Sequence, residues 1–244
     1  MKTVLAVVAL LPAVLRADAL TDLRATLAQL TATSTAHGTF EIESTSKDSD
    51  DARASPGKAA VGFEIDERGL RIIYPNAMLT QAIQEARSEA ADPERQTPVR
   101  SGVRRVQALQ LVDLVNASSM LTTELLNAQL IDVKPSTWRA KPARVISLRL
   151  SPKLSKNESK HIKKMDSTLS VWIGDDGVPL AAENKLYVKA SLMLISFEQN
   201  QTEKWEYARA GDRLITVRYE QDQKSDGFGQ HNATHVLEVV RLEN

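Results

Sequence analysis

The chain has 244 residues with 31 basic and 31 acidic side chains, a formal net charge of +0, 42% hydrophobic residues and no cysteine. This composition is typical of a folded globular protein, so it excludes disordered, collagen-like and disulfide-framework classes. Without cysteine the chain cannot form an iron–sulfur cluster, a Cys-ligated zinc site, a thiol nucleophile or a lipid-modified cysteine anchor. The balanced charge argues against a strongly basic nucleic-acid binder, so we expect no nucleic-acid partner.

Residues 1–19 have the three-part pattern of a secretory signal peptide. A positively charged start precedes an apolar stretch of about 13 residues, and Ala17 and Ala19 are the small residues that signal peptidase reads. The apolar stretch is shorter than the ~20 residues of a membrane-spanning helix, and Pro12 interrupts it. We predict cleavage after Ala19 and one exported domain over residues 20–244. An uncleaved anchor or a buried N-terminal helix is the alternative.

The exported compartment is predicted from the missing disulfides. Extracellular domains of this size usually contain them, whereas a periplasmic protein with a large core folds without them. Four Asn-x-Ser/Thr sequons keep a eukaryotic secretory route open, although the first falls in a predicted packed helix. They begin at Asn116, Asn157, Asn200 and Asn232. We predict a periplasmic protein.

The first third of the mature chain changes from helical to strand periodicity. An apolar stripe predicts a helix over Leu20–Ala32, and period-two alternation predicts a strand at Thr39–Ser44. The polar segment Lys47–Lys58 contains a Pro-Gly pair and is predicted as a loop. Two alternating segments, joined by a turn that ends in Gly69, predict a hairpin over Val61–Tyr74.

The next segment has helical periodicity. Asn76–Ala91 is predicted as a helix that begins at a capping asparagine, and Asp92–Gly102, which contains two prolines, as a loop or lid. Val103–Asn127 is the longest apolar helical stretch, with a break near Asn116–Ser119 as an alternative to one continuous helix.

From Leu130 onward the apolar residues alternate with the period of strands. The predicted strands are Leu130–Lys134, Ile146–Leu150, Leu169–Ile173, Val178–Leu180, Leu186–Glu198, Trp205–Tyr207, Leu214–Glu220 and Val236–Leu242, with polar connections at Leu154–Met165 and Asp222–Asn232. Strands joined by short turns form an antiparallel meander, and a sheet of about ten strands curls. We therefore predict an α+β, mainly β fold: an incomplete barrel whose concave face is covered by the three predicted helices.

The order of these elements resembles the LolA/LolB-like periplasmic lipoprotein-carrier superfamily. The segments that carry the resemblance are Ala36–Phe40 at the first strand, Gly69–Pro75 at the end of the hairpin, and Leu169–Leu180 in the meander. The resemblance covers nearly the whole mature chain. It implies an antiparallel half-barrel whose helices cover an apolar cavity for acyl chains. The missing cysteine excludes the membrane-anchored receptor member and leaves a soluble carrier.

The helical segments contain more apolar residues than one packing stripe needs. They are either core residues or the lining of a cavity for an acyl chain, in which each buried methylene contributes about 0.8 kcal/mol. The predicted lining residues are Met78, Leu79, Leu109, Val112, Leu114, Val115, Met120, Leu121 and Leu125.

A basic segment follows the predicted strand at Ile146–Leu150. Its lysines form either a solvated surface or a surface that contacts anionic headgroups or an acidic partner. They are Lys153, Lys156, Lys160, Lys163 and Lys164. The three tryptophans, Trp138, Trp172 and Trp205, are predicted to pack in the sheet or at its rim.

The remaining polar residues do not form a recognisable catalytic or metal motif. His231 and His235 have a spacing that suits a helix better than the predicted strand, and no third ligand stands at a diagnostic distance. His37 and His161 are isolated, and Asp175-Asp176-Gly177 is typical of a hairpin turn. We predict no metal, no cofactor and no enzyme activity.

These observations predict a non-catalytic periplasmic carrier or binding protein for an acylated or lipidic ligand. Its partners would be a lipid or an acylated protein, and it would touch a membrane surface only peripherally. The alternative is an envelope protein-interaction or regulatory module, whose core is filled and whose surface contacts an envelope protein.

Overall fold

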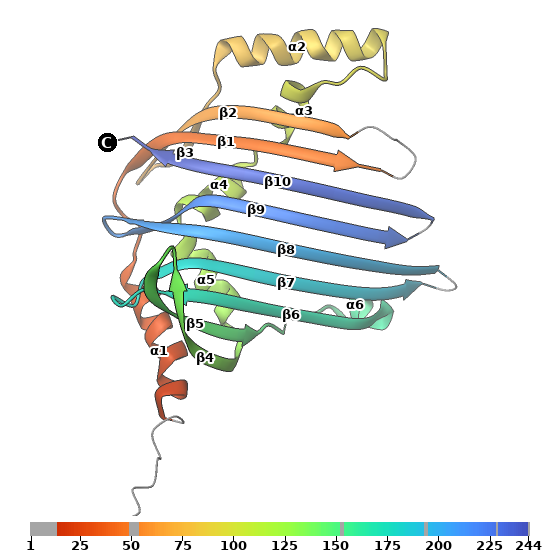
Figure 1. Ribbon diagram of the computed structural model, residues 1–244. Helices are drawn as coiled ribbons and strands as arrows, with labels where there is room; N and C mark the ends of the chain where they lie inside the picture. The colour runs from red at the N-terminus through yellow and green to blue at the C-terminus, as the bar shows by residue number, and fades with distance from the viewer. Residues whose placement is uncertain (1–13, 49–53, 152–153, 193–194, 228, 244) are drawn as a thin grey trace, which may run out of the picture.

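In a computed structural model of the chain, ten strands form one antiparallel sheet (Figure 1). The structure describes residues 14–48, 54–151, 154–192, 195–227 and 229–243, so most of the predicted signal peptide lies outside the described residues. The strands are β1 (Ala36–Lys47), β2 (Ser55–Asp66), β3 (Gly69–Ile73), β4 (Gln129–Trp138), β5 (Lys141–Arg149), β6 (Ile162–Ile173), β7 (Pro179–Leu192), β8 (Ile195–Ala210), β9 (Arg213–Gly227) and β10 (Gln230–Leu242). The predicted fold class, a curled mainly β sheet with helices, is confirmed.

The sheet is a meander that is extended at one end by the N-terminal strands. Its order is β3-β2-β1-β10-β9-β8-β7-β6-β5-β4, so β4 to β10 lie beside one another in chain order. β1 pairs with β10 in a register that places Phe40 opposite Val240. Strands β3 and β4 are the two edges, and the sheet does not close.

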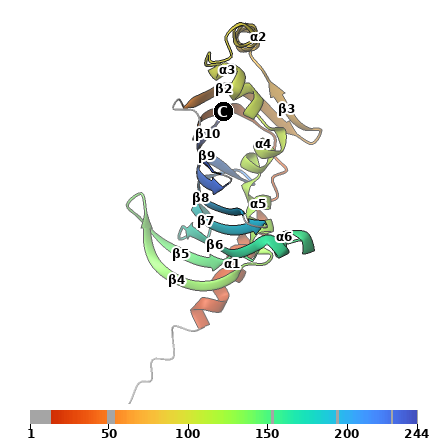
Figure 2. The same ribbon diagram turned by 90° about the vertical axis from the view of Figure 1, so that its right-hand side faces the viewer.

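Six helices are present in the described residues: α1 (Val14–Gln29), α2 (Asn76–Ala91), α3 (Pro98–Arg105), α4 (Ala108–Val115), α5 (Ala117–Leu125) and α6 (Lys156–His161). Figure 2 shows α3, α4 and α5 along one face of the sheet. Helix α2 stands away from the sheet beyond β2, and it has no buried residue (Figure 1). The helices that cover the concave face are therefore α1, α3, α4 and α5, whereas α2 reaches the α4 core only through the partly buried Met78.

The concave face holds two hydrophobic cores. In the α1–α5 core, Leu23 and Leu27 of α1 and Leu121 and Leu125 of α5 pack on strands β5 to β9. In the α4 core, helix α4 packs on β1, β2, β9 and β10 through Leu111, Leu114 and Val115. Trp205 of β8 contacts both cores. The α1–α5 core therefore lies on one half of the sheet and the α4 core on the other half, and the two cores meet near β8.

The helical prediction is confirmed over Asn76–Ala91, although the residue at the cap position is Pro75 and not the expected Asn76. The segment Val103–Asn127 is divided. The chain leaves helical geometry at Val106 and again at Asn116, where φ is −135°. The expected loop over Asp92–Gly102 is wrong in its second half, because Pro98 occupies the first turn of α3, where a proline is tolerated. The first helix ends at Gln29, before the predicted Ala32, whose φ is +53°.

Two predicted loops are shorter than expected because polar strands occupy part of them. β1 extends to Lys47 and β2 begins at Ser55, inside the predicted loop Lys47–Lys58. β9 and β10 run through most of Asp222–Asn232, with Gly227 opposite Gln230. Both faces of these strand ends are polar or exposed, so the apolar alternation that marks a half-buried strand is missing there.

Two further boundaries differ from prediction. The expected strand Leu186–Glu198 is split between β7 and β8, which pair as a hairpin with Leu192 opposite Ile195. The polar connection Leu154–Met165 contains helix α6 and the first residues of β6. Among the described residues, no helix has the length and apolar content needed to cross a membrane.

Helix α3 lies directly on the backbone of β2 at a glycine. A methyl group on Gly102 would come within 2.2 Å of the Lys58 carbonyl carbon, and one on Gly57 would come within 2.5 Å of Ser44 Oγ. Glycine at both positions lets the helix approach the strand more closely than any side chain would allow.

We therefore predict that Gly102→Ala lowers the stability of the protein, although alanine is the better helix former by about 1 kcal/mol. Overpacking against backbone atoms should lower the free energy of unfolding by about 1–3 kcal/mol, measured by urea unfolding. Gly62→Ala is the control, because the atom nearest to its added methyl group is Ile73 Cβ at 3.4 Å. Equal stability of Gly102→Ala and the wild type would contradict this packing.

Candidate functional site

A cavity of about 370 Å³ lies where the α1–α5 core and the α4 core meet. Helices α4 and α5 form one wall, and strands β6 to β9 form the other. The described residues that line the cavity are Gln107, Leu109, Gln110, Asp113, Leu114, Met120, Leu121, Glu124, Leu150, Leu169, Asn184, Glu203, Trp205, Tyr207 and Tyr219. Its size is at the lower end of the range for pockets that bind small ligands.

The structure brings together four of the nine predicted lining residues. Leu109, Leu114, Met120 and Leu121 line the cavity. The other five do not: Val115 and Leu125 are fully buried core residues, Val112 is half-buried on α4, and Met78 and Leu79 lie on helix α2, where Met78 packs against the α4 core. The apolar wall of the cavity is therefore narrower than the sequence predicts, and Leu150 and Leu169 complete it.

The sheet side of the cavity is polar. Glu203 Oε1 accepts a hydrogen bond of 2.8 Å from the Tyr219 hydroxyl, and Glu203 Oε2 accepts one of 3.3 Å from Asn184 Nδ2. The register places these groups together, because Asn184 and Glu203 are directly opposite each other on β7 and β8. Glu203 is thus held as an acceptor in the cavity wall.

Aromatic residues surround this carboxylate. The rings of Trp205 and Tyr219 are 5.6 Å apart between centroids and tilted by 41°. Burial raises the pKa of both Tyr219 and Tyr207, and the negative charge of Glu203 raises it further. Tyr207 is 7% exposed, and its hydroxyl has no hydrogen-bond partner among the described residues. Both phenols therefore stay protonated at neutral pH.

Two more carboxylates stand on the helical side. Asp113 of α4 and Glu124 of α5 are exposed where they line the cavity. Burial raises the pKa of Asp113, and burial followed by the negative charge of Glu203 raises the pKa of Glu124. The effect of Glu203 on Glu124 shows that the two carboxylates lie close enough to interact.

The sequence analysis missed the polar wall, although a signal for it was present. Glu203, Trp205 and Tyr207 are spaced by two, so a strand places all three on one face. The same rule places Glu238 between the buried valines Val236 and Val240 on the concave face. Inward-facing charges in an otherwise alternating strand are the signal that identifies these positions.

Glu238 is 2% exposed and lies beside the cavity wall. Its Oε2 accepts a hydrogen bond of 2.8 Å from Gln110 Nε2, which links β10 to α4. Burial raises the pKa of Glu238 to about 7, and the hydrogen bond from Gln110 opposes part of this effect. A carboxyl group is therefore kept partly protonated under helix α4.

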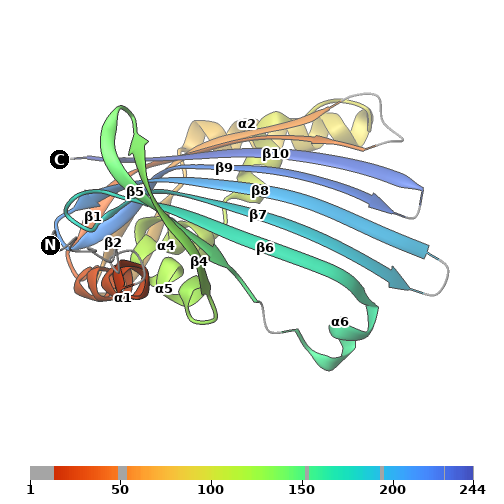
Figure 3. The same cartoon turned by 60° about the horizontal axis from the view of Figure 1, so that its bottom comes forward.

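The predicted basic surface lies elsewhere. Helix α6 and the start of β6 are at the end of the sheet opposite α1 (Figure 3). Lys160, Lys163 and Lys164 are exposed there, and Lys164 Nζ pairs with Asp166 Oδ2 at 3.0 Å. Lys153 lies outside the described residues, and the side chain of Lys156 is not described.

The tryptophans are divided between two sites. Trp138 and Trp172 pack against each other with ring centroids 5.7 Å apart, as the prediction of sheet packing required. Trp205 packs in both cores and also lines the cavity, which the sequence analysis did not predict.

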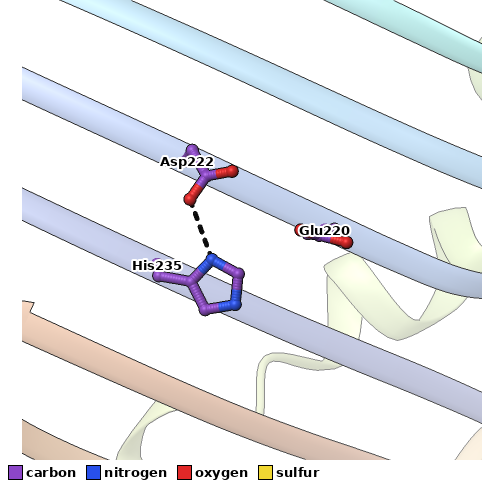
Figure 4. Close-up of side chains that lie close together, drawn as sticks. All are labelled: Glu220, Asp222 and His235. Atoms are coloured by element: carbon purple, nitrogen blue, oxygen red, sulfur yellow. Dashed lines mark hydrogen bonds and ion pairs between the residues drawn. The ribbon is translucent and has the colours of Figure 1, made fainter.

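The two C-terminal histidines do not share a site. His231 Nδ1 pairs with Asp226, whereas His235 Nδ1 lies 2.9 Å from Asp222 Oδ1 (Figure 4). Ligand atoms of Glu220, Asp222 and His235 lie within 4.8 Å of one another. These groups already have partners, because Glu220 accepts a 3.0 Å hydrogen bond from Arg218 and Asp222 lies within hydrogen-bond distance of His235. We therefore describe this cluster as a surface ion-pair group.

Two other candidate positions have structural explanations. Asp176 Oδ1 accepts a hydrogen bond of 3.0 Å from the Val178 amide in the β6–β7 turn, as the turn prediction required. A larger depression of about 620 Å³ lies along α2, but it is more open than the cavity and polar, and it has no wall from the sheet. The cavity at β8 is the candidate functional site.

Comparison with known proteins does not define a family. No family model matches the chain, and no curated protein matches it. One solved structure with some similarity is the crystal structure of MucB in complex with MucA(peri), with 10% identity, 91% of this chain and 93% of that chain covered, and a TM-score of 0.19. This TM-score does not define a shared fold. The curled antiparallel sheet is shown, and membership of the LolA/LolB-like superfamily stays a prediction.

We predict that Glu238→Gln stabilises the protein at neutral pH. From pH 4.5 to about 7 the unfolded chain releases the Glu238 proton while the folded protein retains it, so wild-type stability falls as pH rises. The amide cannot ionise and can still accept a hydrogen bond from Gln110. Urea unfolding should show that the free energy of unfolding of the variant exceeds that of the wild type. This difference should grow with pH and approach about 3 kcal/mol above pH 7. An equal difference at pH 4 and pH 8 would contradict the raised pKa.

Proposed function

We propose that this protein is a non-catalytic binding protein that holds the hydrocarbon part of a small amphiphilic ligand in the cavity at β8. The observation that carries the proposal is a cavity of about 370 Å³ left between two well-packed cores. Its apolar wall, formed by Leu114, Leu121 and Leu169, lies opposite fixed hydrogen-bonding groups. An apolar lining with a few oriented polar groups is the usual architecture of small-ligand pockets.

The small volume of the cavity limits the size of the lipid that we propose as its ligand. Core residues such as Leu111, Val115 and Leu125, which are fully buried, fill most of the space between helices and sheet. The remaining volume supports binding of one short chain rather than a multi-chain lipid. Leu109, 81% exposed on α4, supplies apolar surface at the cavity where such a chain would enter.

The composition of the lining supports binding without covalent catalysis. The described lining residues include no serine, threonine, cysteine, histidine or lysine, so the usual side-chain nucleophiles are missing from it, and its ionisable groups are three carboxylates and two tyrosines. Binding of this kind needs no cofactor, since release to a partner of higher affinity only requires a difference in binding free energy.

The alternative role, an envelope protein-interaction module, is favoured by helix α2. It has no buried residue, and it exposes Leu79 and Ile83, the latter by 55%. Arg100 anchors it to α3, because its backbone amide donates a 2.8 Å hydrogen bond to Glu85 Oε2 and its guanidinium pairs with Glu89. A protein with only this role would not bind small amphiphiles in the cavity.

Binding of 1-octanol, followed by isothermal titration calorimetry, tests the proposed function. We expect a dissociation constant of about 10 μM to 1 mM, from burial of the alkyl chain minus the cost of association. Met120→Trp should fill the cavity and weaken binding at least fivefold, because Met120 is a half-buried, flexible lining residue. Native mass spectrometry of protein purified from cells should also show a co-purified amphiphile.

Two control variants separate the cavity from other surfaces. Leu126→Trp adds the same ring at a position that is 69% exposed and outside the lining, so it should leave octanol affinity unchanged. Lys160→Glu, in the basic segment, should also leave it unchanged. No octanol binding by the wild type, or equal loss in Met120→Trp and Leu126→Trp, would refute the proposed cavity.

The proposed location is the periplasm, and it rests on the predicted signal peptide. Intact-mass measurement of the protein exported from a bacterial cell should give a chain that begins at Leu20. This cleavage would remove the first six residues of α1 and retain Leu23 and Leu27, which pack in the α1–α5 core. A chain that keeps residues 1–19 would support the alternative of an uncleaved N-terminal segment.

A further inference from the structure

The cavity at β8 is acidic as well as partly apolar. Its described lining contains Asp113, Glu124 and Glu203 and no basic residue, although the chain as a whole has equal numbers of basic and acidic residues. Most carboxylates elsewhere on the sheet have a cationic partner, for example Glu206 with Arg139 and Glu198 with Lys189. The charge of the cavity is therefore not balanced by its own lining.

An independent observation points to a missing hydrogen-bond partner inside the cavity. Tyr207 lines the cavity, and its hydroxyl is buried and has no hydrogen-bond partner among the described residues. A buried hydroxyl without a partner is unfavourable, and buried polar groups in folded proteins are nearly always paired. A group that enters the cavity would supply the partner that the protein lacks.

The chemistry of the wall defines that group. Glu203 already receives hydrogen bonds from Tyr219 and Asn184, and its carboxylate oxygens can accept more. The Tyr207 hydroxyl oxygen accepts as well, and the tilted rings of Trp205 and Tyr219 attract a cation to their faces. A group that carries positive charge and several N–H donors satisfies all these requirements, whereas a carboxylate or phosphate would be repelled.

We propose that the cavity binds the cationic ammonium group of an alkylamine, with the ammonium between Glu203, Glu124 and the Tyr207 hydroxyl and the alkyl chain against Leu114, Leu121 and Leu169. This inference rests on the proposed function, because it names the class of amphiphile that the same cavity takes. It replaces the general acyl ligand by one with a single chain and a basic head.

Three probes with the same chain length test the head-group preference by calorimetry at pH 8. They are octylamine, 1-octanol and octanoate, each used below its aggregation concentration. We expect octylamine to bind at least tenfold more tightly than octanol, and octanoate at least tenfold more weakly. High salt should reduce the difference in affinity between octylamine and octanol, because salt screens charge interactions. It should not abolish octanol binding.

Three variants assign the preference to named groups. Glu203→Gln and Glu124→Gln should each reduce the octylamine-to-octanol affinity ratio about tenfold. Glu206→Gln is the matched control: it makes the same change of charge on the same strand, but Glu206 is not among the lining residues and pairs with Arg139. It should leave the ratio within twofold of the wild-type value.

Tyr207→Phe gives a readout that a purely structural role would not produce. Removing an unpartnered buried hydroxyl should leave the Tm of the unliganded protein unchanged or raise it, while octylamine affinity falls threefold or more. A lower Tm together with unchanged octylamine affinity would show that the hydroxyl has an internal role and would overturn this part of the proposal.

The outcomes distinguish the two levels of the proposal. If all three probes bind equally, or if octanoate binds best, the ammonium site is refuted and the apolar binding function stands. If none of them binds, the proposed function itself fails, and the interaction role is favoured instead. Tighter binding of octylamine that persists in Glu203→Gln and Glu124→Gln would locate the cation outside this cavity and would refute the assignment.

Discussion

The arrangement of the whole concave face depends on the break in the helical segment at Asn116. A continuous helix would lie straight across the sheet, whereas the curled sheet presents two surfaces in different directions. The break allows α4 to pack on β1, β2, β9 and β10 and α5 to pack beside α1 on the other half. Ser118, just after the break, donates a hydrogen bond of 2.9 Å to the Leu30 carbonyl and joins α5 to the end of α1. The cavity is the space that two separately packed helices leave between them.

Much of the fold was predictable because periodicity reports burial directly. The antiparallel meander of about ten strands, the helix Asn76–Ala91 and the turn at Asp175-Asp176-Gly177 follow from local patterns, and the structure contains them. The errors occur where one face of an element is not apolar. β9 and β10 continue through the expected loop Asp222–Asn232 because backbone pairing holds a polar strand that has no apolar alternation. Helix α2 has a helical sequence but no buried residue, and only the partly buried Met78 packs against the α4 core, so a helix prediction could not show that most of α2 lies off the sheet.

The candidate site was predicted only in part, since lining a cavity is a property of three-dimensional packing. Leu121 and Leu125 are one helical turn apart on α5 and look equivalent in sequence, yet Leu121 lines the cavity and Leu125 is sealed in the core. The polar wall comes from strands far apart in sequence, and only the register of β7 with β8 places Asn184 beside Glu203. An apolar cavity was expected, and the structure shows a cavity whose lining also contains Asp113, Glu124 and Glu203.

The pairing of β1 with β10 has a consequence for how the molecule reaches its folded state. Contacts such as that of Glu41 with Arg241 join residues 200 positions apart, and closing a loop of that length slows folding. The N-terminal hairpins and α4 therefore dock only after the last strand is available, while β4 to β9 can pair with their chain neighbours as they emerge. Until the last strand is available, one edge of β1 has no partner strand, although β1, β2 and β3 can already pair with one another. The half of the cavity contributed by α4 is consequently the part assembled latest.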